Sequence, residues 1–192
     1  MTEGLVDGRC WWGSSTPDYI AYHDEEWGRP VRDSRALFEK LSLEAFQSGL
    51  SWITILRKRD NFRAAFANFD VEKIAAFDDS DVARLMADAG IVRNRQKVDA
   101  TIANARAVID LDVDLAGLIW SFAPEPRPRP RTIADVPALI PESTAMAKEL
   151  KRRGFRFVGP TTAYAMMQAC GLVDDHIAGC LVPTESRGTA SA

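Results

Sequence analysis

Hydrophobic residues recur three and four positions apart along most of the chain, and alternating β-branched stretches are few. Behind a capping Asp33, for example, Leu37, Phe38, Leu41 and Phe46 fall on one stripe of a helix. Such spacing is typical of amphipathic helices that bury one face. We therefore expect an all-α fold, with helices over about residues 34–47, 51–66, 79–89, 93–109, 115–122, 143–153 and 161–170.

Helical patterning is interrupted in two places. Pro124–Arg131 alternates proline with charged residues, which predicts an extended, exposed connection rather than a recognition motif. The last ten residues, Pro183–Ala192, are small and polar, and we expect them to form a disordered tail. The remaining residues, 1–182, are expected to form a single domain around one core.

The overall composition is that of an ordinary globular protein. Hydrophobic residues make up 46% and charged residues 27% of the 192 positions. The sequence has no apolar run of about 18 residues and no basic-then-apolar leader, so we expect no membrane association and a cytoplasmic location. Its three cysteines are widely spaced, which argues against a disulfide framework.

The net charge of −3 does not by itself indicate a nucleic-acid binder, because such domains are often strongly basic. Lysine and arginine nevertheless cluster at residues 57–59, 93–97, 127–131 and 151–153. Each cluster alone is typical of a solvated surface. Together they indicate a nucleic-acid surface only if the fold brings several of them onto one face.

The chain contains only two histidines, and each has a cysteine near it in sequence: His23 follows Cys10, and Cys180 follows His176. Two thiolates and two imidazoles form a closed tetrahedral set that suits a structural Zn²⁺, since catalytic zinc keeps an open position. Such a metal would join the first and last segments of the chain. From spacing alone, a zinc site and a chance pairing are both open interpretations.

Gly90 separates two predicted helices, and Arg93 and Lys97 follow it at the start of the second. A glycine-centred hairpin at this point would present backbone N–H groups and positive charge to a phosphate without reading base sequence. Plain helix packing explains the same pattern. The hairpin is therefore one candidate contact with a nucleic-acid backbone.

Five aromatic residues fall within the first 27 positions: Trp11, Trp12, Tyr19, Tyr22 and Trp27. They could line a slot for a flat ring or form a small core around the metal, and we favour the core interpretation for Trp11 and Trp27. Glu44 lies in a largely apolar helix, where an ionised carboxylate is costly without partners. In a pocket it would favour a cationic guest, with Trp52 adding a cation–π face; otherwise it lies on the polar surface.

Several longer motifs resemble those of one known family: Arg9–Trp12, Asp18–Gly28, Glu44–Arg57, Asp88–Ile91, Trp120–Phe122 and Arg153–Cys180. They include the strings Tyr-His-Asp-x-Glu-Trp-Gly, Gly-Leu-Ser-Trp-Ile-Thr and Gln-Ala-Cys-Gly-Leu-Val-x-Asp-His. In order and over nearly the whole chain, the sequence resembles the DNA-3-methyladenine glycosylase I family. That resemblance implies an all-α helix-hairpin-helix glycosylase fold, with a structural zinc joining the N- and C-terminal segments.

The resemblance also implies an activity. The family hydrolyses the N-glycosidic bond of 3-methyladenine in alkylated double-stranded DNA, releasing the free base and leaving an abasic site for base excision repair. The zinc ligands correspond to Cys10, His23, His176 and Cys180. The resemblance places no lysine as a covalent nucleophile, so we expect a monofunctional enzyme without strand cleavage. We also expect the protein to act as a monomer.

Site residues follow from the same resemblance. It assigns catalysis to Glu44 and Tyr22, base binding to Trp52, Trp12 and Tyr19, and DNA contacts to Gly49 and Leu50. The glycine-centred hairpin adds Gly90, Arg93 and Lys97 as expected DNA contacts. The Gly49-Leu50 pair corresponds to a plug that fills the gap left by the extruded nucleotide. Phe46 stands where the family has a glutamine, which leaves open the contacts beside Glu44. Asp110, Asp112 and Asp114 are taken as a polar helix end, since the family lacks the sugar-stabilising aspartate of the wider superfamily.

Two alternatives remain at this stage. A damage-recognising protein that has lost catalysis would bind alkylated DNA without releasing a base, although Glu44, Tyr22 and Trp52 are all present. A zinc hydrolase or deaminase would need an open coordination site on the metal and a glutamate as general acid and base. A closed four-ligand set argues against the second alternative.

Overall fold

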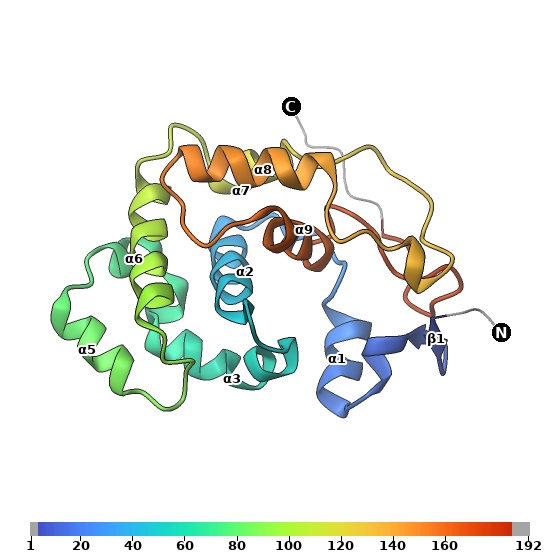
Figure 1. The fold of residues 1–192 in the computed structure, drawn as a ribbon, viewed down its shortest axis with the longest axis horizontal. Coiled ribbons are helices and arrows are strands. Elements are labelled where there is room, and N and C mark those ends of the chain that lie inside the picture. Colours follow the sequence, from blue (N-terminus) through green and yellow to red (C-terminus); the bar gives the residue numbers. More distant parts are fainter. Residues whose placement is uncertain (1–3, 186–192) are drawn as a thin grey trace.

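The structure is a computed structural model that describes residues 4–185 (Figure 1). Its described residues form a short hairpin, β1 (Leu5–Val6) and β2 (Arg9–Cys10), and helices α1 (Pro17–Glu25), α2 (Ser34–Gln47), α3 (Trp52–Ala65), α4 (Val71–Ala75), α5 (Asp79–Ala87), α6 (Arg95–Ile109), α7 (Leu115–Trp120), α8 (Pro141–Arg152) and α9 (Pro160–Ala169). Three 3₁₀ turns complete it: η1 (Trp11–Ser14), η2 (Ala67–Phe69) and η3 (Ile133–Asp135). The fold is therefore mostly helical.

Helix α2 occupies the middle of the molecule and contacts α3, α6, α7 and α9 (Figure 1). The apolar stripe expected from the sequence is buried, with Leu37, Phe38, Leu41 and Phe46 all inaccessible to solvent. The ring of Phe46 lies 4.7 Å from that of Phe62 and turns into the core. A full side chain of this kind contributes about 1.5–3 kcal/mol by leaving water, so the stripe anchors α2 firmly.

Each helix expected from periodicity is present, and the expectation of an all-α fold is wrong only in the small hairpin. Strands of two residues, joined through the positive-φ residues Asp7 and Gly8, are too short to show a periodic pattern. Helices α1 and α4 were also not expected. The start of α1 has a local signal, because the Thr16 side chain accepts a hydrogen bond from Tyr19 N and Pro17 occupies the first helical position.

Residues 88–94 connect α5 to α6, and we refer to them as the 88–94 hairpin. This hairpin packs against α3. Lys58 Nζ lies 3.0 Å from the Ala89 carbonyl oxygen and 3.2 Å from that of Gly90. Asn61 also donates to the Gly90 carbonyl, at 3.2 Å. The expected pair of helices around Gly90 thus exists, and α3 holds its turn in place.

The proline-rich stretch 124–130 is neither helix nor strand, as expected, but it is not a free loop. Arg127 forms an ion pair with Asp175, and Arg129 forms one with Asp174. Residues 183–185 are exposed and lack regular structure, whereas the rest of the expected tail, 186–192, lies outside the described residues. Within the described part of the chain, no helix has the length and hydrophobicity needed to cross a membrane.

Candidate base cavity and metal cluster

Cys10, His23, His176 and Cys180 meet in one buried cluster, with their ligand atoms all within 4.8 Å of one another. Cys180 Sγ lies 3.5 Å from His23 Nε2 and 3.6 Å from His176 Nδ1, and Cys10 Sγ lies 3.7 Å from His176 Nδ1. Around a tetrahedral zinc with ordinary Zn–S and Zn–N bonds, sulfur and nitrogen ligands stand about 3.6 Å apart. The spacing of the four side chains therefore fits such an ion.

The far side of each imidazole in this four-ligand cluster is fixed by an acceptor. His23 Nδ1 lies 2.8 Å from Asp24 Oδ1, a carboxylate that Arg9 also holds, and His176 Nε2 lies 3.2 Å from the Trp27 carbonyl oxygen. Such partners select the tautomer whose other nitrogen faces a metal. Burial lowers the pKa of His176 to about 4, which favours the neutral imidazole that binds metals.

Cys10 completes the electrostatics of the cluster. Burial raises the pKa of its thiol to about 12, while the Ile177 N–H, 3.3 Å from the sulfur, opposes that rise. A buried thiolate is costly without a cation, and a divalent metal removes that cost. Two glycines let the rings approach the backbone, since a Cβ on Gly13 would lie 2.6 Å from the His23 ring and one on Gly28 would lie 2.9 Å from His176 Nε2.

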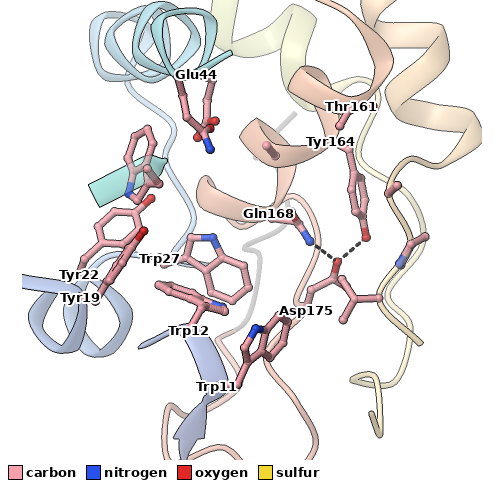
Figure 2. Close-up of a pocket in the computed structure, with 16 residues that line it drawn as sticks. Trp11, Trp12, Tyr19, Tyr22, Trp27, Glu44, Thr161, Tyr164, Gln168 and Asp175 are labelled. Atoms are coloured by element: carbon pink, nitrogen blue, oxygen red, sulfur yellow. Dashed lines mark hydrogen bonds between the residues drawn. The ribbon is translucent and has the colours of Figure 1, made fainter. Parts of the chain in front are cut away.

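Beside the cluster lies a cavity of about 390 Å³, within the size range of small-molecule sites. Figure 2 shows aromatic residues on one side of it, Glu44 on another, and Tyr164, Gln168 and Asp175 opposite. The cavity is formed by η1, α1, α2, α9, the start of α3 and residues near η3. Its lining includes Trp11, Trp12, Tyr19, Tyr22, Trp27, Glu44, Gln47 and Trp52. We refer to it as the aromatic cavity.

Glu44 faces the aromatic cavity and is only 5% exposed, so it does not lie on the polar surface of α2. Burial raises the pKa of its carboxyl to about 7, and the positive charge of Lys40, one helical turn away, opposes the rise. No hydrogen bond from the described residues contributes to that balance. Among the described residues the Glu44 carboxylate therefore has no hydrogen-bond donor, and a cationic guest in the cavity would supply a partner.

Tyr22 and Trp52 form the wall next to Glu44, with ring centroids 5.5 Å apart. Tyr22 is buried, and burial raises the pKa of its hydroxyl well above the usual value. The Tyr19 hydroxyl accepts a hydrogen bond from Ile53 N at 3.0 Å, which ties α1 to the first turn of α3. Trp52 Nε1 is buried and has no acceptor among the described residues. The expected base-binding residues are therefore brought together.

The two remaining tryptophans behave differently from each other. The Trp27 ring lies 4.7 Å from the His176 ring and 5.0 Å from that of Trp12, so it packs on the cluster as expected while also lining the cavity. Trp11 was also expected in a core around the metal, and this was wrong. Its side chain is 39% exposed and forms part of the cavity rim.

Four polar residues of this region were not identified from the sequence: Lys40, Tyr164, Gln168 and Asp175. Asp175 is buried and accepts hydrogen bonds from Tyr164 and, at 2.9 Å, from Gln168 Nε2 (Figure 2). Gln168 and Asp175 belong to the motif Gln-Ala-Cys-Gly-Leu-Val-x-Asp-His, which could have identified them as site residues. Lys40 had a weaker one, a charged residue on the apolar stripe four positions before Glu44.

Four of the candidate DNA-contacting residues lie in two connections, Gly49 and Leu50 between α2 and α3, and Gly90 and Arg93 between α5 and α6. Gly49 has a φ of +84°, and Leu50 is 43% exposed between the cavity-lining Gln47 and Trp52. In the 88–94 hairpin Arg93 is exposed, whereas the Gly90 N–H donates to Asp88 Oδ1 at 2.7 Å. The Gly90 amide is therefore already bonded within the hairpin.

Lys97 is placed differently from the expectation of a phosphate contact. Its side chain is buried, and Nζ donates to the carbonyl oxygens of Phe46 at 2.8 Å and Ser48 at 2.6 Å. Burial lowers the pKa of its ammonium. Exposed lysines are typical of phosphate contacts, but the direction of this one depends on how closely α6 approaches α2, which sequence spacing does not reveal.

Comparison with known proteins agrees with this geometry. The chain is 50% identical to DNA-3-methyladenine glycosylase 1 of Escherichia coli over 90% of its own length and 95% of that protein. It is 44% identical to a DNA-3-methyladenine glycosylase of Haemophilus influenzae, over 90% and 96% of the two chains. A Staphylococcus aureus 3-methyladenine DNA glycosylase I, whose structure was solved for 3-methyladenine recognition, superposes with a TM-score of 0.88 at 34% identity, over 93% and 98% of the chains.

The family model described as methyladenine glycosylase matches residues 11–183, a span that includes the aromatic cavity and all of the four-ligand cluster except Cys10. Together with relatives at 44–50% identity over nine-tenths of the chain, this match shows the relationship. The protein belongs to the methyladenine glycosylase family.

Proposed function

We propose that this protein hydrolyses the N-glycosidic bond of 3-methyladenine in alkylated double-stranded DNA, releasing the free base and leaving an abasic site. The observation that supports this most directly is the position of Glu44, a buried carboxylate that accepts no hydrogen bond from residues 4–185, beside the rings of Tyr22 and Trp52. The named activities of the family's members agree with it.

Charge provides the selection. Methylation at N3 gives the adenine ring a positive charge and weakens its glycosidic bond, so the leaving group needs little protonation. An ionised Glu44 attracts that charge strongly in a site shielded from water, whereas ordinary adenine is neutral and gains nothing from it. The faces of Trp52 and Tyr22 add cation–π stabilisation, and Trp12 and Tyr19 complete the slot.

Chemistry then proceeds on a base that has left the helix. Extruding a nucleotide costs a few kcal/mol, less where damage has weakened its pairing. In this proposal Leu50, presented by Gly49, fills the gap in the stack, and the 88–94 hairpin holds the backbone through the exposed Arg93, because the Gly90 N–H already donates to Asp88. The glycosidic bond breaks with its electron pair going to the base, which leaves as neutral 3-methyladenine. Water then adds to the oxocarbenium-like sugar and loses a proton to solvent. None of the described residues that line the aromatic cavity is a lysine, which supports simple hydrolysis over strand cleavage.

We also propose that α5, the 88–94 hairpin and α6 form the helix-hairpin-helix element and that the protein acts as a monomer. Cys10, His23, His176 and Cys180 would hold a structural zinc that joins β2 and α1 to the segment after α9. Four protein ligands leave no open position for water, so a hydrolase or deaminase based on the metal is not supported.

Base release decides between the enzyme and an inactive damage-binding protein. We expect methylated duplex DNA incubated with the protein to yield free 3-methyladenine, separable by chromatography, without strand breaks until the abasic sites are cleaved by alkali. The Glu44→Gln variant is expected to release far less. Tight binding of the alkylated duplex with no free base would support the inactive alternative.

A further inference from the structure

The ammonium of Lys97 is committed to the end of α2. Its side chain is 6% exposed, and both hydrogen bonds from Nζ go to backbone carbonyls, those of Phe46 and Ser48. The last carbonyls of a helix have no partner within it, and a cation near them is favoured by the helix dipole. Lys97 therefore caps α2 from a neighbouring helix and does not face a phosphate.

The hydrogen bond from Lys97 to the Ser48 carbonyl also holds a turn, because Ser48 is the second residue of the Gln47–Leu50 turn. Leu50 N donates to the Gln47 carbonyl at 2.6 Å, Ser48 has φ −48° and ψ 116°, and Gly49 has φ +84°. These values describe a type II turn, which needs glycine at its third position. Type I and type II turns differ in the orientation of the central peptide, whose carbonyl oxygen is the Ser48 oxygen held by Lys97.

Contacts made by α3 and α6 connect the Gln47–Leu50 turn to the 88–94 hairpin. The Gln47–Leu50 turn leads directly into α3, and Lys58 and Asn61 of α3 bind the Gly90 carbonyl of the 88–94 hairpin. The hairpin leads into α6, and Lys97 on the first turn of α6 returns to the Gln47–Leu50 turn. The segment proposed to grip phosphates and the segment proposed to enter the base stack are therefore linked at both ends.

We propose that Lys97 is a positioning residue that fixes the central peptide of the Gln47–Leu50 turn and so holds Leu50 ready to enter duplex DNA. This inference rests on the proposed function, because it assigns a role within base extrusion. Lys97 affects the opening of the duplex and not the recognition of the base. A residue with this role is needed for excision from duplex DNA and dispensable for binding the free base.

Lys97→Met removes the charge and both hydrogen bonds while keeping a long unbranched side chain. We expect about a tenfold slower single-turnover release of 3-methyladenine from duplex DNA, the size of effect typical of a lost charge-assisted hydrogen bond. Affinity for free 3-methyladenine should stay within about twofold, because the aromatic cavity is unchanged. Lys148→Met, an exposed lysine on α8, is the matched control for loss of charge.

A double-mutant cycle separates positioning from general damage. In a Leu50→Ala background the Lys97→Met change should have no further effect on duplex excision, since there is no side chain left to position. The salt dependence of duplex binding should keep its slope. A slope flattened by about one would make Lys97 a phosphate contact, and additive effects in the cycle, or a parallel loss of free-base affinity, would also overturn the inference.

One readout does not depend on catalysis. In the free protein, Lys97→Met should shift or broaden the backbone amide signals of Gly49 and Leu50 in a ¹H–¹⁵N spectrum, whereas Lys148→Met should leave them in place. If the wild-type protein released no base, the proposed function would fail while these signals still tested the turn. Should the methionine variant not fold, Lys97→Gln, which removes the charge and is too short to make both hydrogen bonds, provides the comparison. Unmoved Gly49 and Leu50 signals in whichever variant folds would reject the inference.

Discussion

The ammonium nitrogen of Lys40 lies 3.3 Å from the hydroxyl oxygen of Tyr22, behind the wall of the aromatic cavity. An ammonium group can only donate, so the Tyr22 oxygen accepts and its own proton is left to donate elsewhere. Lys40 also pairs with Glu26 at 2.9 Å and lies 5.2 Å from the centre of the Trp52 ring. This buried lysine therefore sets Tyr22 up as a hydrogen-bond donor.

Replacing Lys40 should change the pH dependence of excision. Burial raises the pKa of Glu44 and the charge of Lys40 lowers it, and together they leave it at about 7. Without the Lys40 charge, the pKa would be higher. In Lys40→Met the carboxyl should stay protonated to higher pH, so the acid limb of the pH–rate profile moves upward and neutral-pH excision falls several-fold. Lys40→Arg, which keeps the charge, is the control. An acid limb that stays in place in the methionine variant would contradict this electrostatic role.

Glu44→Gln should stabilise the fold at alkaline pH while it impairs activity. In the unfolded chain the Glu44 carboxyl has the ordinary glutamate pKa of 4.5, whereas in the folded protein burial raises that pKa to about 7. Between these values the folded state binds more protons, so the free energy of unfolding falls as pH rises. The variant escapes that loss, which is at most about 3 kcal/mol.

Thermal unfolding followed at pH 5 and pH 8 measures this effect. We expect the glutamine variant to have the higher melting temperature at pH 8 and a much smaller advantage at pH 5. A variant less stable than the wild type at both pH values would mean that Glu44 is stabilised by partners in the fold. It would then not be poised for a cationic guest.

Removing a cluster ligand should loosen both ends of the chain. In Cys180→Ser we expect loss of bound zinc, measured by elemental analysis, and a melting temperature lower by about 5 °C or more. Cys170→Ser is the matched control, since this third buried cysteine lies outside the cluster. It can lower stability by disturbing the core, but it should leave the zinc content at one per chain. Full zinc occupancy in Cys180→Ser would argue against the ligand assignment.

Arg93→Ala should weaken binding to duplex DNA of any sequence and reduce the slope of log affinity against log salt by about one. The exposed position of Arg93 in the 88–94 hairpin supports this expectation. Titration of a fluorescent duplex at several salt concentrations measures the slope, with Lys148→Ala on α8 as control. Equal slopes for Arg93→Ala and wild type would place the hairpin away from DNA.

Residues that repeat with helical spacing were predictable, because burial of one face dictates their pattern. The four-ligand cluster was accessible as well, since its members are rare residue types and include every histidine of the chain. Lys97 and Lys40 were not. The sequence does not show whether a lysine side chain extends into solvent or is buried. The approach of α6 to α2 buries Lys97, and the approach of α1 to α2 buries Lys40.

Trp11 illustrates the other difficulty. Aromatic residues near a metal cluster fit a small core as well as a binding slot, and their sequence spacing in an irregular arm fixes no face. The two tryptophans occupy different positions in the structure. Trp27 packs against His176, whereas Trp11 remains at the cavity rim. The short helix α1, missed by periodicity, is what orders Tyr19 and Tyr22 on the cavity side.

The proline-rich stretch 124–130 crosses to the end of the chain, where Arg127 and Arg129 pair with the consecutive residues Asp175 and Asp174. His176 comes next in sequence. In this tripeptide Asp174 therefore binds the proline-rich stretch, Asp175 lines the aromatic cavity and His176 belongs to the four-ligand cluster. Adding or deleting a residue between the two arginines would put them out of step with their carboxylates. The two ion pairs thus fix the spacing between these arginines.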